Sequence, residues 1–300
     1  MFKFLDVKRK IIEIGLFFKL SLSKIASSII YFRIIFLSKP KTHTGIDPGS
    51  DKNIIVSLTT LPHRTKSSLV AIYYLLFQEE IKPNKIILWI TESENQFFKA
   101  LNKRGRKLLE KLKQYGLEIY QTEDMGPLTK FLPTKEHYPN SIIVTSDDDI
   151  IYPRKWLKEL YESYLKSPKH IHCYRAHNMT FHDCGRPKKY NNWQFESIGT
   201  EGPSLDLFPT GVFGVLYAPS HLDEQVLNKE QYKRLSFKND DVWLKAMSLK
   251  KGVLCKKVKK TTPSFFEINF NKKSPLNRTN VHRSHNDICI DNVWKHYFNT

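Results

Sequence analysis

Three consecutive aspartates, Asp147, Asp148 and Asp149, are the residues whose types and spacing point most directly to chemistry. They follow residues 141–145, a β-rich apolar run with the length of a buried strand. Like charges this close are unfavourable unless a cation or hydrogen bonds neutralise them. Hard cations such as Mg²⁺ or Mn²⁺ take one or two carboxylates and complete their shell with water and phosphate oxygens. The triplet predicts a metal–diphosphate site. The alternative is a solvated acidic turn in which one aspartate caps a helix.

The residues after the triplet predict a helix. Pro153 suits a first helical turn. Apolar and aromatic residues then recur at helical spacing: Trp156, Leu157, Leu160, Tyr161 and Tyr164. The three acids therefore lie between the carboxyl end of a strand and a helix, where open α/β sheets hold their ligands.

Alternation of strands and helices dominates the chain from residue 53 to the triplet. Strands are predicted over residues 54–58, 85–90 and 117–120, a helix face over 69–77 and a basic helix over 97–115. This order predicts an α/β fold with a mostly parallel sheet flanked by helices. The dinucleotide pattern G-x-G-x-x-G and the P-loop pattern are both absent, so neither a classical dehydrogenase nor a P-loop ATPase is expected.

A second acidic pair, Asp240 and Asp241, opens a predicted helix further along the chain. Asn239 or Asp240 can cap that helix, and its dipole favours acids in the first turn. A cap accounts for one acid but not for two. Before this pair, residues 202–217 are rich in glycine, proline and apolar residues. They indicate either close backbone approach to a ligand or an ordinary β-turn-β element.

The charge of the chain lies towards its two ends. Lys and Arg number 48 against 30 acids, a formal charge of +18, which favours a polyanionic partner. Within residues 1–41 the acids are Asp6 and Glu13. The basic residues there are Lys3, Lys8, Arg9, Lys10, Lys19, Lys24, Arg33, Lys39 and Lys41. No uncharged run in this region approaches the roughly 20 residues that span a bilayer. The pattern predicts an amphipathic helical segment on an anionic membrane surface. A helix packed on the main domain is the alternative.

The four cysteines, Cys173, Cys184, Cys255 and Cys289, form no C-x-x-C pair and indicate reduced thiols. His170, His172, His177 and His182 lie near two of them, but their spacing fits no standard zinc pattern, so ordinary strand and loop histidines are preferred.

Five short motifs occur in order along the chain: residues 59–64 (TTLPHR), 126–130 (GPLTK), 145–153 (TSDDDIIYP), 208–212 (FPTGV) and 239–243 (NDDVW). Over residues 53–292 the chain resembles bacterial GT-A glycosyltransferases that carry a D-x-D motif, of the capsule and lipopolysaccharide type. The resemblance implies a GT-A fold over residues 51–300. Residues 51–167 would be the nucleotide-binding half, and 168–300 the acceptor half with a C-terminal tail. Residues 1–50 would be the membrane-associating segment and linker.

The resemblance also implies roles for residues. Thr59, Thr60, Pro62 and Arg64 would border the nucleotide, and Lys130 the phosphates or donor sugar. Asp147, Asp148 and Asp149 would hold Mn²⁺ or Mg²⁺ on the diphosphate. Thr210 and Gly211 would shape the donor pocket. Asp241 would be the general base, with Asp240 as the alternative. His285, or His282, would be a further metal ligand.

The implied activity is metal-dependent transfer of a sugar from a nucleotide-sugar donor, expected to be a UDP-sugar, to a glycan or lipid-linked acceptor in surface polysaccharide synthesis. A base opposite the leaving diphosphate implies inversion, whereas a retaining enzyme would not need Asp241 as base. The expected location is the cytoplasm, peripherally on the cytoplasmic face of the inner membrane, with no nucleic-acid partner.

Two other classes of protein remain as alternatives. A phosphatase of the haloacid dehalogenase type also places D-x-D after an apolar strand. It would normally do so at its first strand, whereas three predicted strands precede Asp147 here. A basic nucleic-acid-binding protein would use the charge directly, but the chain carries no recognisable module for it.

Overall fold

Strand β1, Ile54–Thr59, lies inside a seven-stranded sheet because its run of β-branched and apolar residues can be buried on both faces. The computed structural model describes residues 22–36, 44–91, 94–270 and 285–298. Within them the sheet has the order β10-β6-β9-β4-β1-β2-β3. The other strands are β2 Lys85–Ile90, β3 Leu117–Gln121, β4 Ile142–Thr145, β6 Ile171–Cys173, β9 Val215–Tyr217 and β10 Cys255–Lys257.

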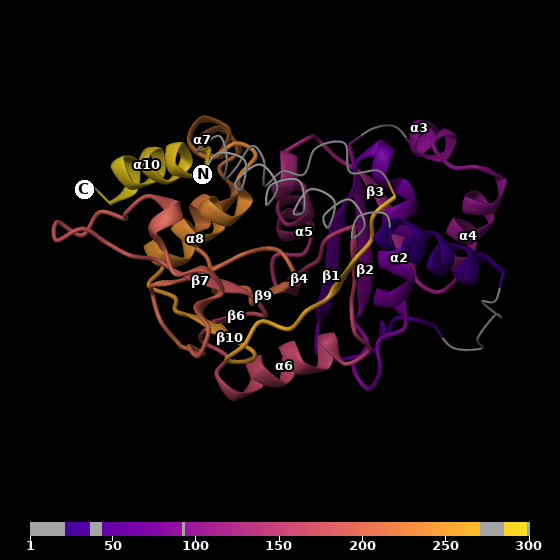
Figure 1. The fold of residues 1–300 in the computed structure, drawn as a ribbon, viewed down its shortest axis with the longest axis horizontal. Helices are drawn as coiled ribbons and strands as arrows, with labels where there is room; N and C mark the ends of the chain where they lie inside the picture. Colours follow the sequence, from indigo (N-terminus) through magenta and orange to yellow (C-terminus); the bar gives the residue numbers. More distant parts are fainter. Residues whose placement is uncertain (1–21, 37–43, 92–93, 271–284, 299–300) are drawn as a thin grey trace, which may run out of the picture.

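Most neighbours in this sheet are parallel. Strand β1 pairs in parallel with both β2 and β4, β2 with β3, and β10 with β6. Strand β9 is antiparallel to both of its neighbours, β4 and β6. The predicted fold class, α/β with a mostly parallel sheet flanked by helices, is confirmed (Figure 1). The sheet also joins strands from both sides of residue 167.

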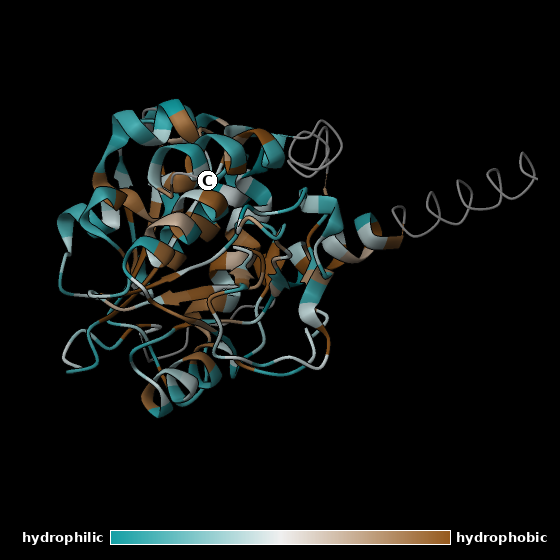
Figure 2. Ribbon diagram, turned by 90° about the vertical axis from the view of Figure 1, so that its left-hand side faces the viewer, coloured by the Kyte–Doolittle hydropathy of each residue, from teal (hydrophilic) through white to brown (hydrophobic). Residues whose placement is uncertain are grey.

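Helices pack on both faces of the sheet. Val56 and Leu58 point into a core shared with α2 (Thr65–Leu76), α4 (Lys103–Gln114) and α6 (Trp156–Lys166). Ile143 and Tyr217 point into a second core, built with α5 (Leu132–His137), α7 (Lys229–Leu235), α8 (Asp240–Lys250) and α10 (His285–Tyr297). Figure 2 shows brown strands between helices that carry teal segments, as expected for elements with one buried side.

The structure departs from the predicted elements at three places. The basic helix predicted over residues 97–115 is two helices, α3 (Glu94–Lys99) and α4, because the Asn102 side chain accepts a bond from the Gly105 N–H and starts a new helix. Pro153 precedes α6 instead of lying in its first turn, and its carbonyl accepts from the Trp156 N–H. Residues 202–217 form two strands, β8 (Leu207–Pro209) and β9, in different sheets.

Several short elements complete the fold. Strand β5 (Ile150–Ile151) pairs antiparallel with β11 (Phe266–Glu267), and β7 (Ala176–Asn178) pairs antiparallel with β8. Single 3₁₀ turns are η1 (Pro62–Arg64), η2 (Gly126–Lys130), η3 (Tyr190–Asn192), η4 (Phe195–Ser197) and η5 (Glu224–Leu227).

Of the predicted N-terminal segment, residues 22–36 are described, and they form a helix. Ile34 is buried in the core that contains α2 and α4, and Ile30, Tyr31 and Ile35 pack against it. The rest of the segment, including most of its basic residues, lies outside the described residues. None of the helices within the described ranges combines the length and the apolar character that a bilayer-spanning segment needs.

The cysteines and their neighbouring histidines have structural surroundings. Cys173, Cys184, Cys255 and Cys289 are all free thiols. The two ring nitrogens of His172 lie 2.8 Å from Ser163 Oγ and 3.0 Å from the Ser167 carbonyl oxygen. In the described part of the chain, no group of His, Cys, Asp and Glu side chains is arranged to hold a metal ion, zinc included.

Candidate active site

The candidate site lies where the carboxyl ends of β1 and β4 meet. These strands are parallel neighbours, so the turns that follow them leave the sheet at the same edge. The chain continues from β1 to β2 on one side, while β4 lies on the other side of β1. This is the point of an α/β sheet where the strand order reverses and ligands bind.

Thr60 and Arg64 bring the turn after β1 onto the aspartate triplet. The Thr60 hydroxyl donates to Asp148 Oδ2 at 2.6 Å. The Arg64 guanidinium lies 2.9 Å from Asp148 Oδ1 and also pairs with Asp149. Burial raises the pKa of Asp148 to about 7, although the charge of Arg64 opposes that rise. One face of the triplet is therefore neutralised by side chains of the β1 turn.

Asp147 is held from two other sides. Its backbone N–H donates to the hydroxyl of the buried Tyr152 at 2.7 Å. Its Oδ1 lies 3.0 Å from Nζ of Lys130, which comes from η2. Tyr152 was missed as a site residue, although it belongs to the same D-D-D-I-I-Y-P motif as the triplet. Its hydroxyl fixes the backbone at the point where the triplet begins.

Lys130 joins the triplet to the second acidic pair. Its Nζ lies 3.3 Å from Asp240 Oδ2 as well as close to Asp147, and its side chain is 9% exposed. Burial acts to lower the pKa of Lys130, but the charges of Asp147, Asp240 and Asp241 outweigh burial and hold that pKa well above its ordinary range. The lysine is a permanent cation between two groups of acids that lie far apart in the sequence.

The acidic pair opens α8, as predicted. Asn239 caps the helix by accepting from the Val242 N–H, which leaves both Asp240 and Asp241 in the first turn. Asp241 Oδ1 accepts from the backbone N–H of Gly211 at 2.8 Å. Burial, followed by the charge of Asp240, raises the pKa of Asp241 to about 8. A carboxylate with a pKa near the working pH is suited to take up a proton.

Gly211 stands against both Lys130 and Asp241. A Cβ added at this glycine would lie 2.8 Å from Lys130 Nζ and 3.2 Å from Asp241 Oδ1. The lack of a side chain lets the backbone N–H reach the carboxylate. The adjoining Thr210 is buried, and its hydroxyl lies 3.4 Å from the Arg175 guanidinium. Arg175 also pairs with Glu196 at 3.3 Å. Sequence reasoning missed this pair, because no motif links residues 175 and 196.

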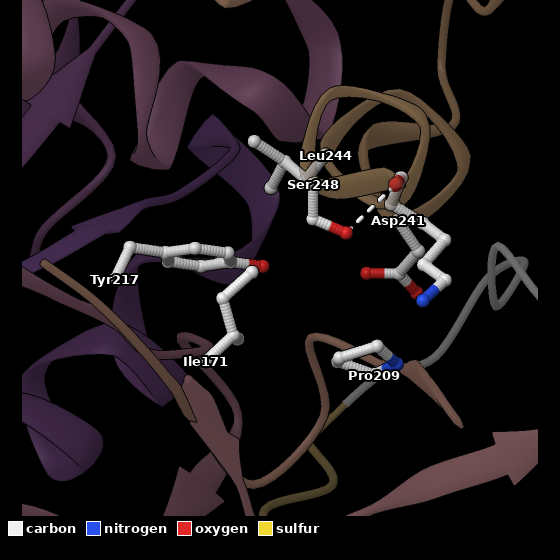
Figure 3. A pocket seen from close by; sticks show the side chains of 7 residues that line it. Ile171, Pro209, Tyr217, Asp241, Leu244 and Ser248 are labelled. Atoms are coloured by element: carbon white, nitrogen blue, oxygen red, sulfur yellow. Dashed lines mark hydrogen bonds between the residues drawn. The ribbon is translucent and has the colours of Figure 1, made fainter. Parts of the chain in front are cut away.

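A narrow cavity borders Asp241 (Figure 3). Its walls are Ile171, Pro209, Tyr217, Asp241, Leu244, Lys245 and Ser248. Figure 3 shows the Ser248 hydroxyl turned to a backbone oxygen, which is the 2.8 Å bond to the Lys245 carbonyl. The cavity is too narrow to admit a water-sized sphere, so it holds no substrate. Its walls combine apolar side chains with Tyr217, Lys245 and Ser248, and a space this narrow keeps bulk water from that side of Asp241.

Three predicted residues lie apart from these clusters. The Thr59 hydroxyl donates to the Trp89 carbonyl on the neighbouring strand β2. Pro62 is exposed and begins η1, so it shapes the turn that carries Arg64. The His285 Nε2 lies 2.9 Å from the Phe237 carbonyl oxygen and 3.5 Å from Cys289 Sγ. His282 lies outside the described residues.

The triplet has the oxygen donors that Mg²⁺ and Mn²⁺ prefer, but not a complete cage of protein ligands. In the ranges that the structure describes, no group of three or more ligating side chains is arranged around one point. Asp147 and Asp149 are partly exposed, on the edge of the sheet where a ligand would approach. Mg²⁺ sites commonly consist of one or two carboxylates together with substrate phosphates and water. The residues present therefore fit a cation that binds together with a diphosphate.

Comparison with known proteins gives distant likenesses. No protein-family model and no curated protein matches the chain. Among solved structures, the mannosyltransferase PcManGT from Pyrobaculum calidifontis, in complex with GDP-Man and Mn²⁺, is 16% identical, with 90% of this chain and 74% of that chain covered and a TM-score of 0.46. S. aureus TarS 1-349 is 11% identical, with 71% and 58% covered and a TM-score of 0.46. The inositol-1-phosphate CTP transferase from T. maritima is 12% identical, with 82% and 98% covered and a TM-score of 0.42. The fold class rests on the sheet itself, and we draw no functional conclusion from likenesses at these scores.

Proposed function

We propose that this chain is a nucleotide-sugar-dependent glycosyltransferase of the GT-A type, which uses Mn²⁺ or Mg²⁺. The donor is a UDP-sugar and the acceptor is a glycan or lipid-linked glycan of a surface polysaccharide, reached from the cytoplasmic face of the membrane. The observation that supports this best is the pairing of two acidic clusters at the edge where β1 and β4 end. Lys130 lies 3.0 Å from an oxygen of one cluster and 3.3 Å from an oxygen of the other.

The donor would bind along the turn after β1 and the triplet. Thr59, Thr60, Pro62 and Arg64 would border the nucleotide, Arg64 and Thr60 through their side chains beside Asp148 and Thr59 and Pro62 as parts of the turn that carries them. Arg64 and Lys130 would supply positive charge to the diphosphate, since both lie beside the triplet and their ion pairs would be exchanged for phosphate oxygens once a cation occupies the carboxylates. Asp147, Asp148 and Asp149 would hold the divalent cation. When bound, that cation supplies Lewis-acid stabilisation of the leaving diphosphate.

The acceptor hydroxyl must lose a proton as the sugar is transferred. Asp241 is the base in this proposal. The Gly211 N–H fixes one of its oxygens at 2.8 Å, and its raised pKa matches the task. Asp240 is the less suitable base because its Oδ2 lies beside the charged Lys130. A single base on the side opposite the diphosphate gives inversion at the anomeric carbon.

Ligand-induced thermal stabilisation tests this function. UDP-sugars with Mn²⁺ are expected to raise the melting temperature of the wild-type protein, since saturating ligand at a hundred times its Kd adds about 2.7 kcal/mol. Asp148→Ala should abolish the shift, because it removes the carboxylate that Thr60 and Arg64 hold. Asp51→Ala, at an exposed aspartate before β1, is the matched control and should keep the shift.

Equal shifts for wild type and Asp148→Ala would contradict the assignment of the triplet. Turnover of p-nitrophenyl phosphate without any nucleotide-sugar shift would favour a phosphatase. Salt-sensitive retention on oligonucleotides without such a shift would favour a nucleic-acid-binding protein.

A further inference from the structure

The helix over residues 22–36 has one face fixed to the domain. Ser27 is 1% exposed, and its hydroxyl accepts from the Asn269 N–H at 2.9 Å. Ile34 is buried in the core, and the Tyr31 ring meets the Phe270 ring edge-on at 5.7 Å. These contacts fix the rotation of the helix about its own axis. Its opposite face must therefore point away from the domain.

That opposite face is apolar. The side chains along it are 50–65% exposed: Leu22, Ile25, Ile29, Phe32 and Phe36. Their spacing alternates between three and four residues, so they form one continuous line, called here the apolar stripe. Phe32 and Phe36 are in ring contact at 4.1 Å. Single exposed apolar residues are ordinary, but a contiguous apolar surface marks a site of interaction. In Figure 2 this helix lies at the margin of the fold, and the exposures above show that the described residues leave the stripe largely uncovered.

Positive charge borders the apolar stripe. Residues 22–36 contain no acid, and Lys24 and Arg33 are exposed on the same helix. The Arg104 guanidinium of α4 lies 4.9 Å from the centre of the Phe36 ring, so α4 borders one end of the stripe. Lys103, Arg104 and Lys107 of α4 are exposed, and the one acid of α4 is Glu110. An apolar line bordered by basic side chains matches the interface of an anionic lipid bilayer.

We propose that the apolar stripe docks this protein on an anionic membrane, with its apolar side chains among the acyl chains and the basic residues at the lipid phosphates. A second copy of the chain fits this face less well. Pairing two such helices would bring like charges together with no acid on either helix to offset them. The docking does not depend on the proposed sugar transfer.

Co-sedimentation of the chain of residues 1–300 with vesicles tests the proposal. The probe is phosphatidylcholine vesicles with about one third phosphatidylglycerol, compared with pure phosphatidylcholine. The variant is Ile25→Ser/Ile29→Ser, at positions 57% and 61% exposed. The matched control is Leu165→Ser/Ile288→Ser, at positions 57% and 55% exposed on α6 and α10. Because all four side chains are exposed, both variants should melt at the wild-type temperature.

Wild type and control are expected to bind the anionic vesicles equally, and the stripe variant at least about tenfold more weakly. Binding to pure phosphatidylcholine should be weaker by about fivefold for each basic residue that contacts the surface. Failure of the wild type to bind, or equal binding by all three proteins, would overturn the proposal. The proposal would also be overturned if the wild type were a dimer in lipid-free solution and the stripe variant a monomer, with the two proteins binding vesicles equally. The stripe variant should still show the thermal shift with a nucleotide-sugar. Loss of vesicle binding with this shift retained therefore concerns the membrane proposal alone and not the proposed sugar transfer.

Discussion

The two acidic clusters of the candidate site differ in what neutralises them. The triplet after β4 is held by the ends of flexible side chains, from Thr60, Arg64 and Lys130. The pair that opens α8 shares Lys130 but is otherwise held by a backbone N–H, that of Gly211. Side-chain donors can turn away when a ligand brings its own charges, whereas a backbone amide in a packed turn stays in place. The triplet is therefore built to exchange partners, and the pair is built to hold one carboxylate still.

This difference assigns distinct roles to carboxylates of the same type. A binding cluster must accept a cation and phosphates in turn, so partly exposed oxygens such as those of Asp147 and Asp149 suit it. A general base must keep its position and have a pKa near the working pH. Asp241 meets both conditions. The pKa of Asp148 is also raised, to about 7, but Asp148 is held by the side chains of Thr60 and Arg64 and not by a backbone N–H. The predictions below test whether the two clusters separate in this way.

The largest expected effect is on the rate of transfer by Asp241→Asn. Asparagine keeps an oxygen that can accept from the Gly211 N–H but cannot take a proton. The rate should fall by roughly 10²–10⁴-fold while donor affinity stays within about twofold. Single-turnover kinetics together with calorimetric titration of the donor measure both quantities. Asp240→Asn is the companion variant; a larger loss there than at Asp241 would transfer the role of base to Asp240.

The next largest effect is a loss of folding stability in Lys130→Met. This variant removes the ammonium group that pairs with both Asp147 and Asp240. Breaking a buried ion pair by deleting one partner destabilises by roughly 3–5 kcal/mol, and three acids surround this lysine. Urea unfolding should show a loss of about 3 kcal/mol. Lys135→Met is the control, since Lys135 donates to two carbonyl oxygens instead of carboxylates. Equal losses for the two variants would mean that Lys130 does not link the clusters electrostatically.

The sequence was sufficient to predict that the turn after β1 lies beside the aspartate triplet, but not that the triplet lies near the pair Asp240 and Asp241. The runs that became β1, β2, β3 and β4 are apolar and of strand length. Parallel order alone then places the turns after β1 and β4 at one edge of the sheet. The proximity of Thr60 to Asp148 follows from that order. The metal, nucleotide and base roles of these residues stay predictions.

The contacts of Lys130 with Asp240 could not be predicted, because they depend on how η2 and α8 pack across a second core. The place of strand β9 in the sheet could not be predicted either. A β-turn-β element over residues 202–217 was one of two alternatives, but three residues without periodicity do not indicate that β9 runs antiparallel between β4 and β6 and brings Tyr217 to the cavity beside Asp241. His285 illustrates the same limit at the C-terminus. Its ring contacts Cys289 one turn along α10 and the carbonyl oxygen of Phe237, which lies between α7 and α8, the two helices on which α10 packs.

The smallest predicted effect is a gain in folding stability in Asp241→Asn, the same variant that is expected to lose activity. The pKa of Asp241 is about 8 in the folded protein and about 3.9 in the unfolded chain. Between these values the folded state holds a proton on Asp241 that the unfolded state releases, so the contribution of Asp241 to the stability of the wild type falls as the pH rises from about 4 through 8. Asp241→Asn removes that loss. We expect the variant to be more stable than the wild type by about 1–2 kcal/mol at pH 8, a value reduced from the full shift because Asp241 is partly exposed.

Thermal unfolding without metal or nucleotide, followed from pH 4 to pH 8, measures this difference, which should vanish at the acidic end. The matched variant in the other cluster is Asp149→Asn, which loses its ion pair with Arg64. It should be destabilised slightly, by less than about 1 kcal/mol, because such partly exposed pairs contribute little. If both variants gained stability at pH 8, the two clusters would be alike in carrying unfavourable charge, and the separation of binding from base function would lose its electrostatic basis. A gain confined to Asp241→Asn means that the fold holds this carboxylate at a cost in stability, as expected of a group kept for reaction and not for structure.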